Sequence, residues 1–210
     1  MHTMILLVAL LGQTQTAPSN EITLMMHERF AYATMMRTAV IHGYLDRAMR
    51  HARQLNFALE EMSTVRIRQL AEAASKATTL AEAAQGIARV AEACGDCHEE
   101  NKINVVVMGY QAPPLGQDLR ARMGRHIWAA DRMWEGLVAH SESSWVRGSK
   151  ALAQDPFFTP DDEIRVPEEK LDELSSIAAE GEAAKRWTKR AEVYGRFLGA
   201  CADCHETYTH

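Results

Sequence analysis

The chain has 210 residues, of which 47 % are hydrophobic and 24 % are charged, so it is long enough for one large domain or two small ones with packed cores. Its formal net charge of −5 argues against nucleic acid as a partner. The sequence also contains no basic run that would favour an anionic membrane surface.

A short apolar run stands close to the N-terminus. Residues 4–11 are eight consecutive apolar residues, too few to span a bilayer but typical of the hydrophobic part of a secretory signal. A mostly polar stretch over residues 13–19 follows, with Ala17 as a candidate cleavage position. We therefore expect residues 1–19 to be a signal peptide and the rest of the chain to be periplasmic. An uncleaved leader would instead anchor the protein; otherwise we expect no stable membrane insertion.

The next part of the chain has the apolar periodicity of helices and no convincing strand pattern. Three helices are expected over residues 22–42, 45–59 and 64–76. Thr79 followed by Glu82 forms a capping box, which predicts that a fourth helix begins there. The apolar stripe of this helix consists of Leu80, Ala84, Ile87, Ala91 and Cys94.

This fourth helix leads into a C-x-x-C-H motif, and the second half of the chain contains another. The motifs use all four cysteines and consist of Cys94, Cys97 and His98 and of Cys201, Cys204 and His205. C-x-x-C-H is the attachment signal of c-type haem. Cysteines three residues apart share a helix face, so both thiols can form thioethers to one porphyrin edge, and the next histidine can ligate the iron. The sequence therefore predicts two covalently bound haem c groups, with His98 and His205 as proximal ligands.

Other uses of four cysteines fit the sequence less well. A zinc site built from both C-x-x-C pairs would have to join Cys97 to Cys201 across about a hundred residues, whereas compact zinc modules separate their pairs by about 15–20. A disulfide framework leaves the histidine after each pair unexplained. A thioredoxin-like redox pair needs a βαβ setting, which this sequence does not provide.

The two motifs belong to a tandem repeat. With a shift of 98 residues, Met25, Ala31, Met35, Val40 and His42 coincide with Met123, Ala129, Met133, Val138 and His140. With a shift of 107 residues, Ala84, Arg89, Ala93 and Glu99 coincide with Ala191, Arg196, Ala200 and Glu206. The shift grows by nine residues, which indicates an insertion near residues 155–162. The predicted parts are a haem domain over 20–105, a proline-containing linker over 106–115 and a second haem domain over 116–210.

The second half repeats the helical pattern of the first. The stripe of its last helix consists of Trp187, Ala191, Tyr194, Leu198 and Cys201. Each haem is thus expected at the C-terminal end of an amphipathic helix whose apolar face also carries its cysteines.

Four helices with C-x-x-C-H near the end of the last resemble the cytochrome c-prime family of four-helix-bundle haem proteins. The resemblance covers each repeat, although each repeat is shorter than is usual in that family. It implies an all-α fold of two tandem small four-helix bundles, each with its motif at the end of its last helix. The alternative is one bundle of four long helices that carries both haems. Haem is attached to such motifs outside the bacterial cytoplasm, in agreement with the predicted signal peptide.

The sixth ligand of each iron decides between electron transfer and gas binding, because His or Met closes the site and an open side admits a small gas. In an up-down bundle the first helix begins near the end of the last one, which favours His27 and His126 as distal ligands. The alternatives are Met25 and Met123, which match in the repeat. The remaining candidates are an open distal side and the matched pair His42 and His140.

These features favour a periplasmic one-electron carrier over an enzyme. Two haems with different axial ligands would differ in potential, and redox proteins are the expected partners. The alternative is a protein that binds NO or CO at an open distal side, as the family resemblance allows. A dihaem peroxidase is not expected, because the sequence shows no acid–base side chain placed for that chemistry.

Overall fold

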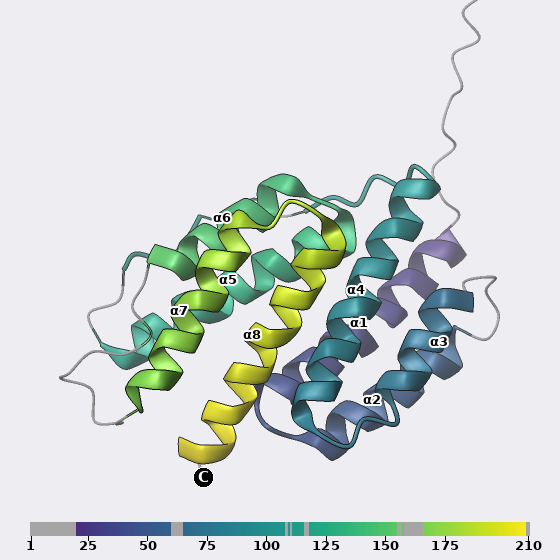
Figure 1. Ribbon diagram of the computed structural model, residues 1–210. Coiled ribbons are helices and arrows are strands. Elements are labelled where there is room, and N and C mark those ends of the chain that lie inside the picture. Colours follow the sequence, from purple (N-terminus) through teal and green to yellow (C-terminus); the bar gives the residue numbers. More distant parts are fainter. Residues whose placement is uncertain are drawn as a thin grey trace, which may run out of the picture.

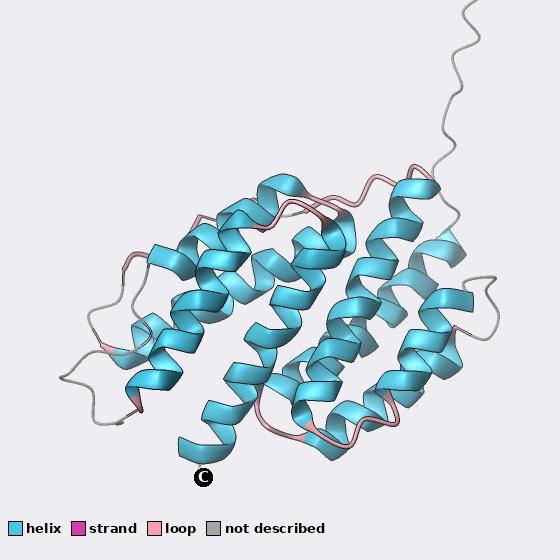
Figure 2. Cartoon of the chain, viewed as in Figure 1, coloured by secondary structure: helices cyan, strands magenta, loops and turns pink. Residues whose placement is uncertain are grey.

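The structure is a computed structural model that describes residues 20–59, 65–107, 109, 111–115, 118–154, 157 and 166–208. Within these residues it contains eight α-helices and no strand, which confirms the predicted all-α class (Figures 1 and 2). The helices are α1 (Asn20–Ile41), α2 (Leu45–Ala58), α3 (Val65–Ala74), α4 (Leu80–Glu100), α5 (Leu119–Ala139), α6 (Glu142–Gln154), α7 (Glu168–Ala183) and α8 (Trp187–Tyr208).

Two predicted segments lie outside the described residues. The predicted signal peptide, residues 1–19, is one of them, and the predicted insertion at 155–162 is the other, apart from Phe157. Among the helices that the structure describes, none has an apolar stretch of the length needed to cross a membrane.

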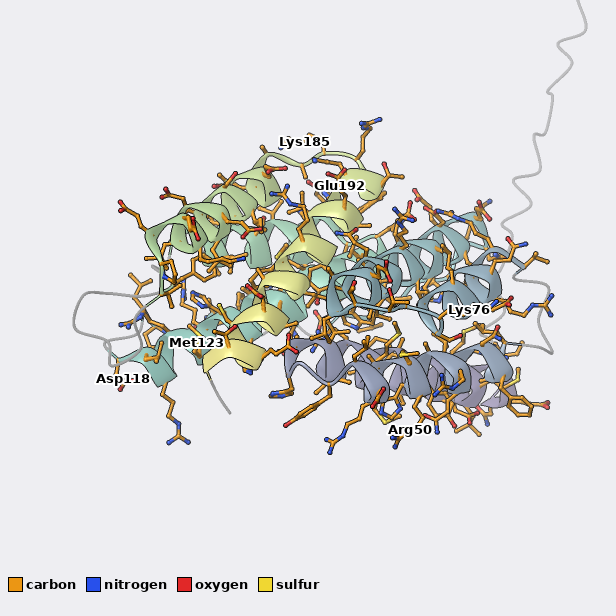
Figure 3. All side chains as sticks on the ribbon, turned by 60° about the horizontal axis from the view of Figure 1, so that its bottom comes forward. Arg50, Lys76, Asp118, Met123, Lys185 and Glu192 are labelled. Carbon is orange, nitrogen blue, oxygen red and sulfur yellow. The ribbon has the colours of Figure 1, made fainter. Side chains whose placement is uncertain are left out.

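Local hydrogen bonds fix where two of the helices begin. Thr79 Oγ1 accepts from the backbone N–H of Glu82 at 3.1 Å, and the Glu82 carboxylate accepts from the backbone N–H of Thr78 at 2.7 Å. The predicted capping box is therefore present, with Thr78 rather than Thr79 as the second donor. At the start of α5 (Figure 3), Asp118 Oδ1 accepts from the backbone N–H of Ala121 at 2.8 Å. This cap was not part of the predicted pattern.

Helices α4 and α8 lie side by side in the middle of the molecule and run antiparallel (Figure 1). Small residues allow the approach: a Cβ added to Gly199 would lie 3.8 Å from Ala81 Cα. Further along, Gln85 Nε2 donates to the Glu192 carbonyl oxygen at 3.1 Å. The motif of each helix is thus level with the start of the other. Fourteen residues separate the start of α8 from Cys201, so the motifs are about 21 Å apart along the axis at a rise of about 1.5 Å per residue.

The remaining helices surround this central pair. In the first half, α1, α2 and α3 pack with α4. In the second half α5 and α7 pack with α8, and α6 packs with α5 and α7 (Figure 2). The halves also contact each other crosswise, because α4 packs against α5 and α8 packs against α1. The hydrophobic core is therefore continuous from one half to the other.

Glycines permit the crosswise contacts. Gly95, inside the first motif, faces the end of α5, where an added Cβ would collide with the Leu137 carbonyl oxygen and the His140 ring. Gly43 has a φ of 75° at the end of α1 and faces the second motif, where the Ala202 carbonyl oxygen would be 3.7 Å from an added Cβ. Each motif is therefore approached by the end of the other half's first helix.

Candidate functional site

A largely apolar cavity lies beside the first motif. Cys94, Cys97 and His98 line it from α4, and its other walls come mainly from α1, α2, α3 and α5. One of its aromatic walls is Trp134, which is 2 % exposed and whose indole Nε1–H has no hydrogen-bond partner among the described residues. The rest of the lining is almost entirely apolar. The cavity therefore suits an apolar ligand such as the ring of a porphyrin.

The imidazole of His98 is held in one tautomer. Its Nδ1 lies 2.9 Å from the carbonyl oxygen of Val138, at the end of α5. Because a carbonyl oxygen can only accept, Nδ1 carries the proton and Nε2 keeps its lone pair for a metal. Metal-ligating histidines usually show this arrangement. The donor set thus fits a haem c, which Cys94 and Cys97 would hold and whose iron His98 would ligate.

All four cysteines are free thiols. Burial raises the pKa of Cys94 and the pKa of Cys201 to about 12 each, and it also raises the pKa values of Cys97 and Cys204. The thiols are therefore neutral at pH 7. The separation of the two motifs by about 21 Å along the axis excludes a single zinc site or a disulfide that uses both pairs.

The residues at the start of α1 lie in different surroundings. His27 is exposed and is not among the residues that line the cavity, and Met25 lines a separate groove between α1 and α2. Met26 lines the cavity together with the first motif, although the repeat did not single it out. An apolar stripe at i, i+4 and i+7, formed by Met26, Phe30 and Ala33, is the signal that could have found it.

In the second half, His126 is less exposed than His27, whereas Met123 is half-buried like Met25. His126 is 5 % exposed, and the centroid of its ring is 4.5 Å from that of Phe157. Met123 is half-buried near the N-terminal end of α5 (Figure 3). Beside the second motif, Lys170 Nζ pairs with Asp203 Oδ2 at 3.0 Å. The roles of His126 and Met123 as iron ligands stay predictions.

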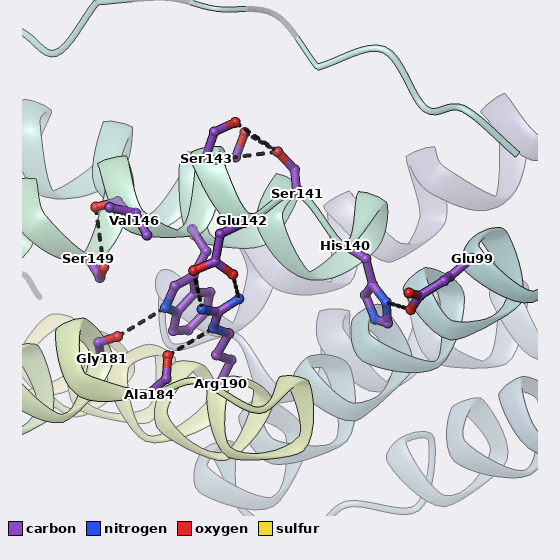
Figure 4. A network of polar contacts seen from close by, with 12 residues as sticks. Glu99, His140, Ser141, Glu142, Ser143, Val146, Ser149, Gly181, Ala184 and Arg190 are labelled. Carbon is purple, nitrogen blue, oxygen red and sulfur yellow. Dashed lines mark hydrogen bonds and ion pairs between the residues drawn. The ribbon is translucent and has the colours of Figure 1, made fainter. Parts of the chain in front are cut away.

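The matched histidines His42 and His140 each lie beside the motif of the opposite half. The ring centroid of His42 is 5.4 Å from that of His205, edge to face. His140 Nδ1 is 2.7 Å from Glu99 Oε2, one residue beyond the first motif (Figure 4). The repeat did not indicate this placement, because it depends on how the two halves pack together.

A buried arginine connects α6 to the start of α8 (Figure 4). Arg190 is 1 % exposed, and its guanidinium donates to both carboxylate oxygens of Glu142 at 2.6 and 2.8 Å. Its Cζ lies 4.3 Å from the ring centroid of Trp187, which in turn stacks on His140 at 4.4 Å. The ends of α5 and α8 that meet the first motif are thus linked by a packed polar network.

Comparison with known protein families, with curated proteins and with solved structures finds no match to this chain. The functional inference therefore depends on the two motifs, the cavity and their surroundings.

Proposed function

We propose that this chain is a dihaem c-type cytochrome that carries single electrons between redox partner proteins in the periplasm. Each half would be a small four-helix bundle, resembling the cytochrome c-prime family, with one haem c at the end of its last helix. Each C-x-x-C pair would form the thioethers, and His98 and His205 would be the proximal ligands. The observation that carries the proposal is the first cavity, which two cysteines and a histidine with a free Nε2 line together.

The residues around this cavity suit a one-electron site. A haem bound there supplies an iron that changes its oxidation state by one electron. The Val138 carbonyl oxygen orients the His98 imidazole and increases its basicity as a ligand. The buried apolar walls, which include Leu55 and Val90, limit the access of water to the site and would thereby tune its reduction potential.

Met26 is the lining side chain best suited to the sixth position. Apart from the motif residues, the cavity is lined by aliphatic and aromatic side chains, by Arg29 and by Met26. The guanidinium is cationic and offers no lone pair to iron, whereas the Met thioether is the sixth ligand in cytochromes c. A haem iron held by both His98 and Met26 would have no open position, which favours electron transfer over gas binding. At the second site, His126 and Met123 are the proposed candidates.

The test is the absorption spectrum of the haem-loaded full chain after reduction with dithionite, recorded with and without carbon monoxide. We expect two covalent haems per chain by mass, sharp α and β bands, and no response to the gas. Met26→Leu should open the first site, so that its bands broaden and respond to carbon monoxide. Met25→Leu is the matched control and should leave the spectrum unchanged, because Met25 lines a different groove.

The other outcomes decide between the alternatives. A chain purified without covalent haem would refute the cytochrome proposal. Gas-sensitive bands in the unmodified protein would mean open irons, and binding of NO or CO would replace electron transfer as the function. If Met26→Leu and Met25→Leu both retained the wild-type spectrum, Met26 would be excluded as the ligand, and His27→Ala would be the next variant.

A further inference from the structure

The two motifs lie at opposite ends of the α4–α8 pair, about 21 Å apart along the axis. Haems attached there are therefore not stacked on one another. Whether one chain works as two separate carriers or as one relay depends on the groups that lie between the motifs.

Two buried aromatic side chains occupy this intervening region. Trp134 of α5 lines the first cavity, and its ring centroid is 6.3 Å from that of Tyr194 on α8. Tyr194 is fully buried and precedes Cys201 by seven residues, which places both on one helix face two turns apart. That spacing corresponds to about 10 Å along the axis. The two rings thus extend from the first cavity towards the second motif.

Hydrogen bonds and charge hold this pair in place. The Tyr194 hydroxyl donates to the Ala130 carbonyl oxygen at 3.0 Å. Arg37, which is 7 % exposed, pairs with Asp131 at 2.5 Å, and its Cζ lies 5.6 Å from the ring centroid of Trp134. The phenol keeps its proton, since burial raises the pKa of Tyr194. The nearby guanidinium charge opposes loss of an electron from either ring.

We propose that Trp134 and Tyr194 form the path by which one electron passes between the two haem sites of a single chain. The proposal rests on the proposed function, because it requires both haems. With haems held by the two motifs, the reduced haem at one site would lose one electron and the oxidised haem at the other would gain it; no bond would form or break, and no proton would move. The rings are the medium for this transfer and are not themselves oxidised, so the chain acts as one relay.

The test follows electron redistribution in the haem-loaded full chain. A redox titration first gives the two potentials, and dipolar electron paramagnetic resonance between the ferric irons gives their separation. A laser flash then delivers less than one electron per chain, and absorbance records its movement from one haem to the other. In the wild type we expect a first-order phase whose rate does not depend on protein concentration.

Tyr194→Leu and Trp134→Leu should each slow this phase severalfold, because aliphatic contacts then replace a ring. Tyr194→Phe keeps the ring and should stay near the wild-type rate. Trp145→Leu is the control for loss of a buried tryptophan, since Trp145 is fully buried and does not line the cavity. All variants should keep two haems and the iron–iron separation. Tyr194→Leu, Tyr194→Phe and Trp145→Leu should also keep both potentials, because Tyr194 and Trp145 do not line the first cavity. Trp134 does line it, so the rate of Trp134→Leu is compared at the potentials titrated for that variant.

An unchanged rate in both leucine variants would overturn the path through the two rings. A wild-type rate that rises with protein concentration would overturn transfer within one chain. Fewer than two haems per chain would instead refute the proposed function, and the mass measurement shows this before any kinetics are recorded.

Discussion

Replacing Gly95 with alanine tests the close approach between the first motif and the end of α5. An added Cβ would collide with the Leu137 carbonyl oxygen and with the His140 ring. That carbonyl belongs to a helix end and cannot rotate away, so α4 and α5 would have to separate. Overpacking of this kind costs about 1–3 kcal/mol of the free energy of unfolding. Gly124→Ala is the matched control, because a Cβ there meets nothing within 4 Å.

Alanine has a higher helix propensity than glycine, so both substitutions stabilise their helix by up to about 1 kcal/mol. The difference in stability between the two variants therefore measures the collision alone. We expect Gly95→Ala to be less stable than Gly124→Ala by about 1–3 kcal/mol, measured by urea unfolding of the haem-loaded chain. The haem content should stay at that of the wild type, because the cysteines and His98 are unchanged. Equal stabilities of the two variants would refute the tight contact between α4 and α5.

Further predictions concern ion pairs and pH. Glu142→Ala should lower the free energy of unfolding by about 1 kcal/mol at neutral pH, because Arg190 loses its bidentate partner; Glu182→Ala, at an exposed position, is the control and should change it little. The hydrogen bond from Arg190 holds the pKa of Glu142 below its ordinary value. The stability that Glu142→Ala loses should therefore be fully lost above the ordinary pKa of a glutamate, and the difference from the wild type should vanish as the pH falls through the lowered pKa. Urea titrations at several pH values measure this difference. The pH dependence of stability that Glu92 contributes has the opposite sign, because burial raises the pKa of Glu92. Arg66→Ala removes the guanidinium that lies 2.7 Å from the Glu92 carboxylate, so the pKa of Glu92 should rise further. As the pH falls from neutral towards the ordinary pKa of Glu92, the free energy of unfolding of this variant should increase by more than that of the wild type. A smaller increase in the same titration would contradict this.

The helices could be predicted because their signals are local. The capping residues Thr79 and Glu82 lie within one turn of the start of α4, and Gly43 lies two residues beyond the end of α1. The structure places the ends of α1, α2 and α3 within two residues of the predicted bounds. Periodicity and caps were therefore sufficient for the order and limits of these helices of the first half.

The site could be predicted only in part. The residues of the two motifs follow from their spacing, but the choice among Met25, Met26 and His27 depends on the rotation of α1. Successive residues turn by about 100° around a helix, and nothing local fixes which of them meets the cavity. The crosswise positions of His42 and His140 depend on contacts between residues about a hundred apart in sequence, which a periodic pattern does not encode.

The hydrogen bond between His98 and Val138 has a consequence for how the protein is made. The N-terminal half is synthesised first, before α5 exists. At that stage the first cavity lacks the walls formed by Trp134 and Val138, and the His98 imidazole lacks its acceptor. The first site therefore acquires its final shape only when the later half folds against it. The N-terminal half, produced alone, would therefore lack two walls of the first cavity and the acceptor of the His98 imidazole.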